Sequence, residues 1–191
     1  VYAFSTENWK RSQSEVSTLM LLLKNYLSKF SKQANKDNIK IQVLGNIEKL
    51  DKGLKKSIND AIERTKDNTG LIVNVAFNYG GRDEIVKAVR KRAADAKENN
   101  VSIENINEEL ISNNLYTAGI PDPDLMIRTS GEIRTSNFLP WQLVYTEDYS
   151  YSSSNNVCPG TANYNKGIDV KITGTKLESY FSSTVKIIKN V

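Results

Sequence analysis

Over residues 1–148, short apolar runs alternate with longer segments in which apolar residues recur every three or four positions. Short apolar runs, three of them ending in polar or glycine-containing segments, predict strands at residues 1–4, 39–44, 71–77 and 124–129. Apolar positions that recur every three or four residues predict helices at residues 14–33 and 52–66 and from Asp83 onward. Strands that alternate with helices favour an α/β fold with a mostly parallel sheet flanked by helices.

Two of these segments carry more apolar residues than their period requires. The run at 71–77 is nearly continuous, which is typical of a strand covered on both faces. In the helix at 14–33, Leu21 and Leu22 widen the apolar face beyond what one sheet contact needs. A well-buried helix is the simpler interpretation, and a face that lines an apolar channel is the alternative.

The helix from Asp83 has apolar residues at helical spacing, and we expect it to bury Ile85, Ala88, Val89, Ala93 and Ala96. Its basic residues are interpreted as a solvated face. Asn105 and Glu108 have the spacing of a capping box for a short helix that ends near Leu115.

The composition changes after Asp148. Residues 149–165 are rich in Ser, Asn, Tyr and Gly, residues 168–172 alternate as a strand would, and residues 177–188 could form a terminal helix. We therefore expect one domain over residues 1–148, followed by a divergent and poorly ordered tail over residues 149–191.

Histidine is absent from the 191 residues, which excludes serine–histidine and cysteine–histidine catalytic arrangements and histidine metal sites. Any metal is then expected to be oxygen-ligated, and Mg²⁺ is the metal that we expect. The single cysteine, Cys158, excludes an intramolecular disulfide and favours a reducing cytoplasm. The net charge of +4 suits an anionic small ligand or membrane surface, but its interleaved signs argue against nucleic acid.

A polar loop follows the strand at 124–129, and it is the strongest candidate for a binding site. Its side chains are Arg128, Thr129, Ser130, Glu132, Arg134, Ser136 and Asn137. Guanidinium groups and hydroxyls are the donors that grip a phosphate or diphosphate. A solvated loop is the alternative, but open α/β sheets place their ligands at such strand ends, which favours the binding site.

Two other loops follow strands in the same way. The loop at residues 5–11 surrounds Trp9 with polar side chains, which favours a wall of a site over an ordinary core position. Gly80 and Gly81 stand between a strand and a helix, where glycines allow close backbone approach, but their spacing matches no nucleotide-binding motif.

Several ordered segments together resemble the cis-prenyltransferases, and among them the bacterial undecaprenyl diphosphate synthases, or isoprenyl transferases. The segments are VYAFSTENWKR (1–11), NYGGRDE (78–84), PDPDLMIRTSGE (121–132), RTSNFLPWQ (134–142) and YTE (145–147). The resemblance implies repeated cis condensation of isopentenyl diphosphate onto an allylic diphosphate such as farnesyl diphosphate, assisted by Mg²⁺. The polyprenyl diphosphate product would serve as a lipid carrier for the cell wall.

The resemblance also implies roles for individual residues. Those that match the isopentenyl diphosphate site are Arg128, Arg134 and Ser136, with Thr135 between them. Those that match the other substrate-contacting loop are Ser5, Thr6, Glu7, Trp9 and Arg11. Asn8 matches a residue with a role in proton removal, and Glu147 matches a Mg²⁺-binding carboxylate. The helix at 14–33 and the strand at 71–77 would line the tunnel for the growing chain.

The partners that the family implies are the two diphosphates, a second copy in a homodimer, and a peripheral membrane contact for product release. The chain also departs from the family. An N-terminal loop with a Mg²⁺-binding aspartate is absent, Ile133 stands where some members have a metal-binding histidine, and the tail is unrelated, as after a frameshift. We therefore expect the chain alone to be inactive. The alternatives are a non-catalytic subunit and a diphosphate-binding module of the same fold.

Overall fold

The computed structural model describes residues 1–98, 102–128, 134–150 and 185–188. It falls into two compact units, which are described separately here. The first unit comprises Val1–Pro121 and Asn137–Trp141, and the second comprises Asp122–Ser136 and Gln142–Val191. The chain therefore leaves the first unit after Pro121 and returns to it at Asn137. The expected boundary between residues 148 and 149 stays a prediction.

The first unit contains most of the regular structure. Its strands are β1 (Tyr2–Ser5), β2 (Lys40–Leu44) and β3 (Ile72–Tyr79), and its α-helices are α1 (Gln13–Lys36), α2 (Lys52–Thr65), α3 (Gly81–Lys97) and α4 (Glu108–Ser112). Its 3-10 helices are η1 (Thr6–Lys10), η2 (Ile47–Lys49) and η3 (Ile103–Asn105). No helix in the described part of the chain has both the length and the apolar character to cross a bilayer.

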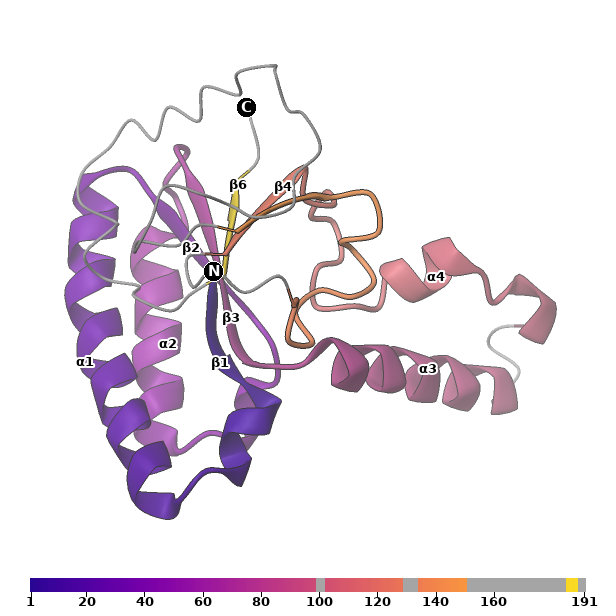
Figure 1. The fold of residues 1–191 in the computed structure, drawn as a ribbon, viewed down its shortest axis with the longest axis horizontal. Helices are drawn as coiled ribbons and strands as arrows, with labels where there is room; N and C mark the ends of the chain where they lie inside the picture. The colour runs from indigo at the N-terminus through magenta and orange to yellow at the C-terminus, as the bar shows by residue number, and fades with distance from the viewer. Residues whose placement is uncertain (99–101, 129–133, 151–184, 189–191) are drawn as a thin grey trace. The chain divides into compact units, whose positions relative to one another are not determined.

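The sheet of the first unit has the order β1-β3-β2, and both pairings are parallel. Helices α1 and α2 lie side by side along it, whereas α3 runs outward from the end of β3 (Figure 1). The apolar core consists of Phe4, Leu27, Leu50, Leu54, Ile58 and Phe77. The expected α/β fold with a mostly parallel sheet and flanking helices is confirmed.

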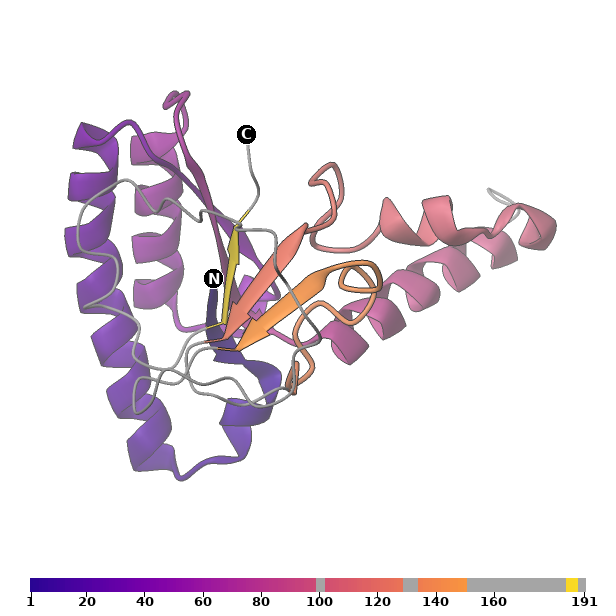
Figure 2. The same ribbon diagram turned by 45° about the horizontal axis from the view of Figure 1, so that its top comes forward.

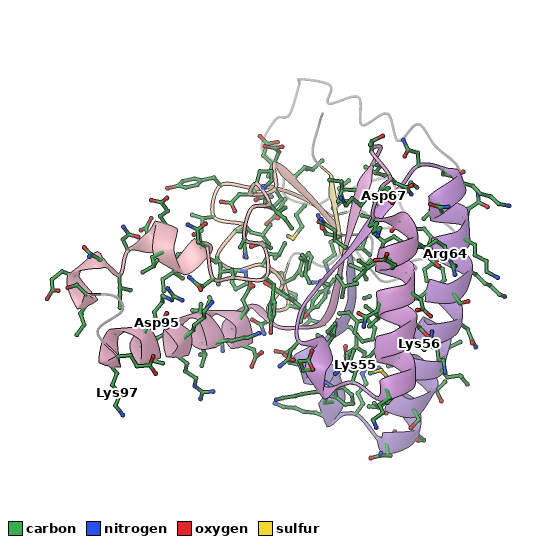
Figure 3. The ribbon with its side chains drawn as sticks, turned by 180° about the vertical axis from the view of Figure 1, so that it is seen from behind. Lys55, Lys56, Arg64, Asp67, Asp95 and Lys97 are labelled. Atoms are coloured by element: carbon green, nitrogen blue, oxygen red, sulfur yellow. The ribbon has the colours of Figure 1, made fainter. Side chains whose placement is uncertain are left out.

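Polar contacts join the two helices and the sheet edge. Arg64 of α2, labelled in Figure 3, donates to the buried hydroxyl of Ser31 in α1 at 3.0 Å. Thr65, which is fully buried at the end of α2, donates its hydroxyl to the Ala61 carbonyl and accepts the Ile41 N–H, each at 3.0 Å. Because β2 is an edge strand, this hydroxyl satisfies a backbone donor that no neighbouring strand could reach.

Three expectations about burial and capping were wrong in detail. Strand β3 is buried only from Ala76 to Tyr79, and Ile72 is half-exposed. In α3, Ala88 is buried but Val89 is 51% exposed and Ala93 is exposed as well, because α3 projects beyond the sheet. The short helix α4 is capped by Asn107, whose Oδ1 accepts the Leu110 N–H at 2.9 Å, and not by Asn105.

The solvated basic face expected on α3 is found only in part. Lys87 lies over the Tyr116 ring, and Arg92 forms a half-buried ion pair with Asp95 at 2.5 Å (Asp95 is labelled in Figure 3).

The second unit is built around a small mixed sheet. Its strands are β4 (Leu125–Arg128), β5 (Glu147–Ser150) and β6 (Val185–Ile188). Strand β4 lies between the other two, parallel to β5 and antiparallel to β6 (Figure 2). The predicted strand at 124–129 is confirmed, but the terminal helix expected to reach Ile188 is wrong there, because residues 185–188 pair with β4. The strand expected at 168–172 lies outside the described residues.

We predict that Thr65→Val destabilises the chain by about 1–3 kcal/mol, because it leaves the Ile41 N–H buried without an acceptor while the side-chain volume hardly changes. Urea unfolding followed by circular dichroism measures this loss. Thr65→Ser keeps the hydroxyl and is the matched control, so an equal loss in both variants would contradict the hydrogen-bond explanation.

Candidate functional site

The loop after β1 is held in a tight 3-10 turn by Asn8. The Oδ1 atom of Asn8 accepts the Ser5 N–H at 2.7 Å and the Ser5 hydroxyl at 3.1 Å. With its carbonyl oxygen occupied by two donors, the amide presents only its Nδ2 donor to a ligand. Asn8 therefore shapes the loop, and its expected part in proton removal stays a prediction.

Trp9 is fixed at the edge of the same loop. Its Nε1 donates to the Asn78 Oδ1 at 2.7 Å, and its ring meets Phe4 edge-on at a centroid distance of 5.3 Å. Asn78 is itself buried at the end of β3 and donates to the Asn46 carbonyl at 2.6 Å. Trp9 remains 43% exposed, so a ring anchored at one end presents a fixed apolar face. This geometry favours the wall of a site.

Glu7 lies on the exposed side of the loop and accepts several hydrogen bonds. Its Oε1 accepts the Asn137 Nδ2 at 2.7 Å, and its Oε2 accepts the Thr6 hydroxyl at 3.3 Å. Burial by itself would raise the pKa of Glu7, but hydrogen bonds from Asn137, its own N–H, Ser5 and Thr6 outweigh it and lower that pKa. Glu7 is therefore held as a carboxylate.

Asn137 also occupies the first backbone donors of α3. Its carbonyl oxygen accepts the Gly81 N–H and its Oδ1 accepts the Arg82 N–H, both at 2.9 Å. These N–H groups would otherwise lack a partner within the helix. Asn137 adopts a φ of +63°, in the left-handed region that asparagine tolerates better than most residues. A residue from a distant part of the sequence thus caps α3.

The two glycines between β3 and α3 make this approach possible. A Cβ on Gly80 would lie 2.3 Å from the Thr6 Oγ1, and a Cβ on Gly81 would lie 1.9 Å from the Pro140 Cδ. Both distances are shorter than any van der Waals contact. The glycine pair therefore serves close packing of the 5–11 loop and residues 137–140 against the start of α3.

Next to this turn, a buried carboxylate joins three segments of the first unit. Glu84 accepts the Tyr79 hydroxyl on its Oε1 and the Tyr116 N–H on its Oε2, the latter at 3.0 Å. Burial, followed by the charge of Glu84, raises the pKa of Tyr79 well above its ordinary value, so the phenol stays protonated and donates. The Glu84 carboxylate thus links Tyr79, the last residue of β3, to the backbone at Tyr116.

In the second unit, Arg134 and Ser136 lie against Arg128. The Arg128 Nη1 donates to the Arg134 carbonyl oxygen and to the Ser136 Oγ, the latter at 3.2 Å. Three residues predicted from the sequence are therefore adjacent in space, with the Arg134 and Ser136 side chains exposed and Thr135 half-buried between them. Thr129, Ser130 and Glu132 of the same loop lie outside the described residues.

Glu147 begins β5, opposite Leu125 of β4, and its side chain is exposed. Its N–H donates to the Asp124 carbonyl at 3.1 Å, which fixes the strand but leaves the carboxylate accessible. Within the described ranges, no three acidic or cysteine side chains gather as a ready-made metal cage. One exposed carboxylate fits Mg²⁺ only in the mode in which substrate phosphates supply most of the remaining ligands.

The structure thus gathers the sequence-predicted residues into two groups. Residues 5–9 and Arg11 form one loop in the first unit, and Arg128, Arg134, Thr135 and Ser136 form the other group in the second unit. Arg11 is exposed, and its charge adds to the Ser12 hydrogen bonds that lower the pKa of Glu15. The sequence places Asn137 in the polar loop but predicts no role for it. A polar residue directly before Phe138, which is buried, is the local signal that could have indicated a structural role.

Comparison with known proteins gives matches along most of the chain. A family model described as "Putative undecaprenyl diphosphate synthase" matches residues 1–159. The isoprenyl transferase of Clostridium tetani is 50% identical over 147 residues, which cover 77% of this chain and 58% of that protein. The isoprenyl transferase of Bacillus anthracis is 47% identical over 147 residues, which cover 77% of this chain and 57% of that protein. The chain therefore spans less than two thirds of these relatives.

Two solved structures share the fold. A probable undecaprenyl diphosphate synthase from Campylobacter jejuni superposes with a TM-score of 0.70 at 34% identity, over 84% of this chain and 73% of that one. A lavandulyl diphosphate synthase from Lavandula x intermedia, in complex with dimethylallyl diphosphate, superposes with a TM-score of 0.74 at 34% identity, over 78% and 65% of the two chains.

We predict that Gly81→Ala destabilises the chain by about 1–3 kcal/mol, because the added methyl group would overlap Pro140 and push the 137–140 segment away from α3. Thermal or urea unfolding measures the loss. Gly53→Ala is the control: its Cβ would lie 3.1 Å from the Asp51 Oδ1, which caps α2, and 3.2 Å from the Lys24 Nζ, so these atoms need shift only by a small amount. Alanine also favours a helix, so this variant should lose much less stability than Gly81→Ala. Equal behaviour of the two variants would refute the packing role of Gly81.

Proposed function

Because this chain belongs to the undecaprenyl diphosphate synthase family of cis-prenyltransferases, we propose that it serves prenyl transfer. The reaction is the repeated cis condensation of isopentenyl diphosphate onto an allylic diphosphate such as farnesyl diphosphate. Each condensation forms a carbon–carbon bond between the allylic carbon and isopentenyl diphosphate, breaks the allylic carbon–oxygen bond to release diphosphate, and releases one proton. The final product is a polyprenyl diphosphate that carries cell-wall intermediates.

The observation that carries the proposal is the cluster of Arg128, Arg134 and Ser136. The Arg128 Nη1 donates to the Arg134 carbonyl oxygen and to the Ser136 Oγ, so the three residues are adjacent in space. A diphosphate presents several anionic oxygens close together, and guanidinium and hydroxyl donors match them in number and geometry. We assign isopentenyl diphosphate to this cluster.

The other candidate residues are assigned to the departure of diphosphate from the allylic substrate. Loss of diphosphate from the allylic substrate becomes fast only when cations and aligned donors meet the charge that develops. Arg11, which is exposed, supplies a guanidinium for that purpose, and Glu147 would hold Mg²⁺ together with substrate phosphates. When bound, Mg²⁺ supplies additional positive charge to the leaving diphosphate. Asn8 and Trp9 shape and shield the loop on which Arg11 stands.

An isoprenoid chain needs an apolar surface along which to grow. On α1, Leu21 and Leu22 are 60% and 59% exposed, while Leu19, Met20 and Leu23 pack half-buried against the core. An exposed pair of leucines beside a packed row supports the proposal that α1 lines the channel for the product. The relative that holds dimethylallyl diphosphate supports an allylic diphosphate as the second substrate.

The setting of the reaction is proposed on the same grounds. We expect a cytoplasmic homodimer that touches the membrane surface peripherally when it releases its product. The basic net charge of +4 is compatible with contact with an acidic membrane surface. A non-catalytic subunit that pairs with a competent partner remains the alternative, and the assay below separates the two.

We predict that the chain binds isopentenyl diphosphate and that Arg128→Ala weakens this binding about 10- to 100-fold, as expected for the loss of charge-assisted hydrogen bonds of about 1.5–3 kcal/mol. Isothermal titration calorimetry measures the affinity. Arg128→Lys keeps the charge but loses the planar fork, so it should fall in between. Arg90→Ala removes an equal charge from the exposed face of α3 and should bind like the wild type.

Incorporation of radiolabelled isopentenyl diphosphate, with farnesyl diphosphate and Mg²⁺, tests the transfer itself. Turnover by the chain alone supports the enzyme and would contradict the inactivity expected from the sequence, whereas turnover only after addition of a second family member supports the non-catalytic subunit. Binding of inorganic diphosphate that equals that of isopentenyl diphosphate, without turnover under either condition, would leave only a diphosphate-binding module.

A further inference from the structure

Asn137 makes three hydrogen bonds that converge from two directions. Its carbonyl and Oδ1 oxygens accept the Gly81 and Arg82 N–H groups at 2.9 Å each, and its Nδ2 donates to the Glu7 Oε1 at 2.7 Å. The side-chain amide is planar, so orientation of its oxygen by the helix also orients its nitrogen. The start of α3 therefore determines where the donor to Glu7 points.

The neighbourhood leaves this side chain little freedom. Phe138 and Leu139, which follow Asn137, are 1% and 4% exposed, and Phe138 stacks on Tyr2 at a centroid distance of 4.5 Å. A Cβ on Gly80 would lie 3.2 Å from the Asn137 Nδ2, so the glycine also leaves room for the amide. The backbone on both sides of the amide contact is thus anchored by packing.

The charge of Glu7 depends on its neighbours. The charge of Glu7 acts in turn on Tyr2 of β1. Burial raises the pKa of Tyr2 to about 12, a hydrogen bond with Ser5 lowers it, and the negative charge of Glu7 raises it further. Tyr2 therefore stays protonated wherever Glu7 titrates. Among side chains outside the 5–11 loop, Asn137 is the donor recorded for Glu7 in the described structure.

We propose that Asn137 is a positioning residue that ties the Glu7 carboxylate to the first turn of α3 and so keeps the 5–11 loop in the arrangement that receives substrate. The functional part rests on the proposed prenyl transfer, whereas the structural part does not. Asn137 touches no reacting atom in this account. It acts through Glu7 and, through Glu7, on the Thr6 hydroxyl that donates to the same carboxylate.

Two substitutions separate positioning from mere capping of the helix. Asn137→Gly removes the side chain but keeps the left-handed backbone and the carbonyl acceptor for Gly81. Asn137→Asp keeps an acceptor for the Arg82 N–H and places a negative charge at the start of α3, which helices favour. It loses the donor to Glu7 and sets a second carboxylate beside it. Asn107→Gly, which removes the cap of α4, is the control.

The decisive measurement is the pKa of Glu7, followed by carboxyl ¹³C NMR on the full chain. Asn137→Gly should raise this pKa toward that of ordinary glutamate, and Asn137→Asp should raise it further, because like charges oppose ionisation. Asn107→Gly should leave it unchanged. A Glu7 pKa that does not change in both Asn137 variants would overturn the proposal, and unfolding curves establish that each variant is folded.

The pH dependence of stability gives a second readout. Because the pKa of Glu7 is lowered in the folded chain, its contribution to stability is present above the unfolded-state pKa and is lost as the pH falls through the folded value. The difference in unfolding free energy between wild type and Asn137→Asp should therefore shrink as the solution is acidified through that range. A difference that is independent of pH would indicate a cap without any role toward Glu7.

Titration with farnesyl diphosphate, the allylic substrate whose diphosphate the 5–11 loop is proposed to meet, connects the bond to function. Binding by the wild type that weakens about tenfold in Asn137→Gly supports positioning for substrate, as expected for one charge-assisted hydrogen bond. Equal affinity in both, despite a shifted Glu7 pKa, would overturn the link to substrate. Absence of binding by the wild type would instead refute the proposed function, and the Glu7 pKa would still decide whether Asn137 positions that carboxylate.

Discussion

The close approach of three chain segments at the end of β3 is the constraint on which the candidate site depends. Two glycines without side chains let Thr6 and Pro140 come within a distance that any Cβ would block. Asn137 lies beside these glycines, where it caps α3 and donates a hydrogen bond to Glu7. Without the glycine pair, neither the cap nor the carboxylate contact has room, and the 5–11 loop loses its outer support.

Much of this architecture could be predicted from the sequence, because it rests on local periodicity. The apolar run at 71–77 indicated a strand, which the structure has at Ile72–Tyr79, and the spacing of Leu54, Ile58 and Ala61 indicated helix α2. The polar loop after β4 was also accessible, since arginines and hydroxyls at a strand end are a local pattern. The structure brings Arg128 against Ser136 as that pattern suggested.

What the sequence could not provide are contacts between residues far apart in the chain. Asn137 caps a helix that begins 56 positions earlier, at Gly81, and the local rules for caps consider only the preceding few residues. The same limit explains the error at Asn105, where two asparagines stood within three positions and only tertiary packing selects Asn107. The partial exposure of β3 and α3 likewise depends on which elements lie beside them.

The chemistry that the family implies and the geometry of the loop set opposite demands on Glu7. A site that binds two diphosphates gains from positive charge, and an unpaired carboxylate in it would repel both substrates. Hydrogen bonds from Asn137 and Thr6 spread the negative charge of Glu7 over neutral donors. The carboxylate can then order the 5–11 loop through these neutral donors. Neutral side chains such as Asn137 and Thr6 are therefore better hydrogen-bond partners for Glu7 than an arginine would be.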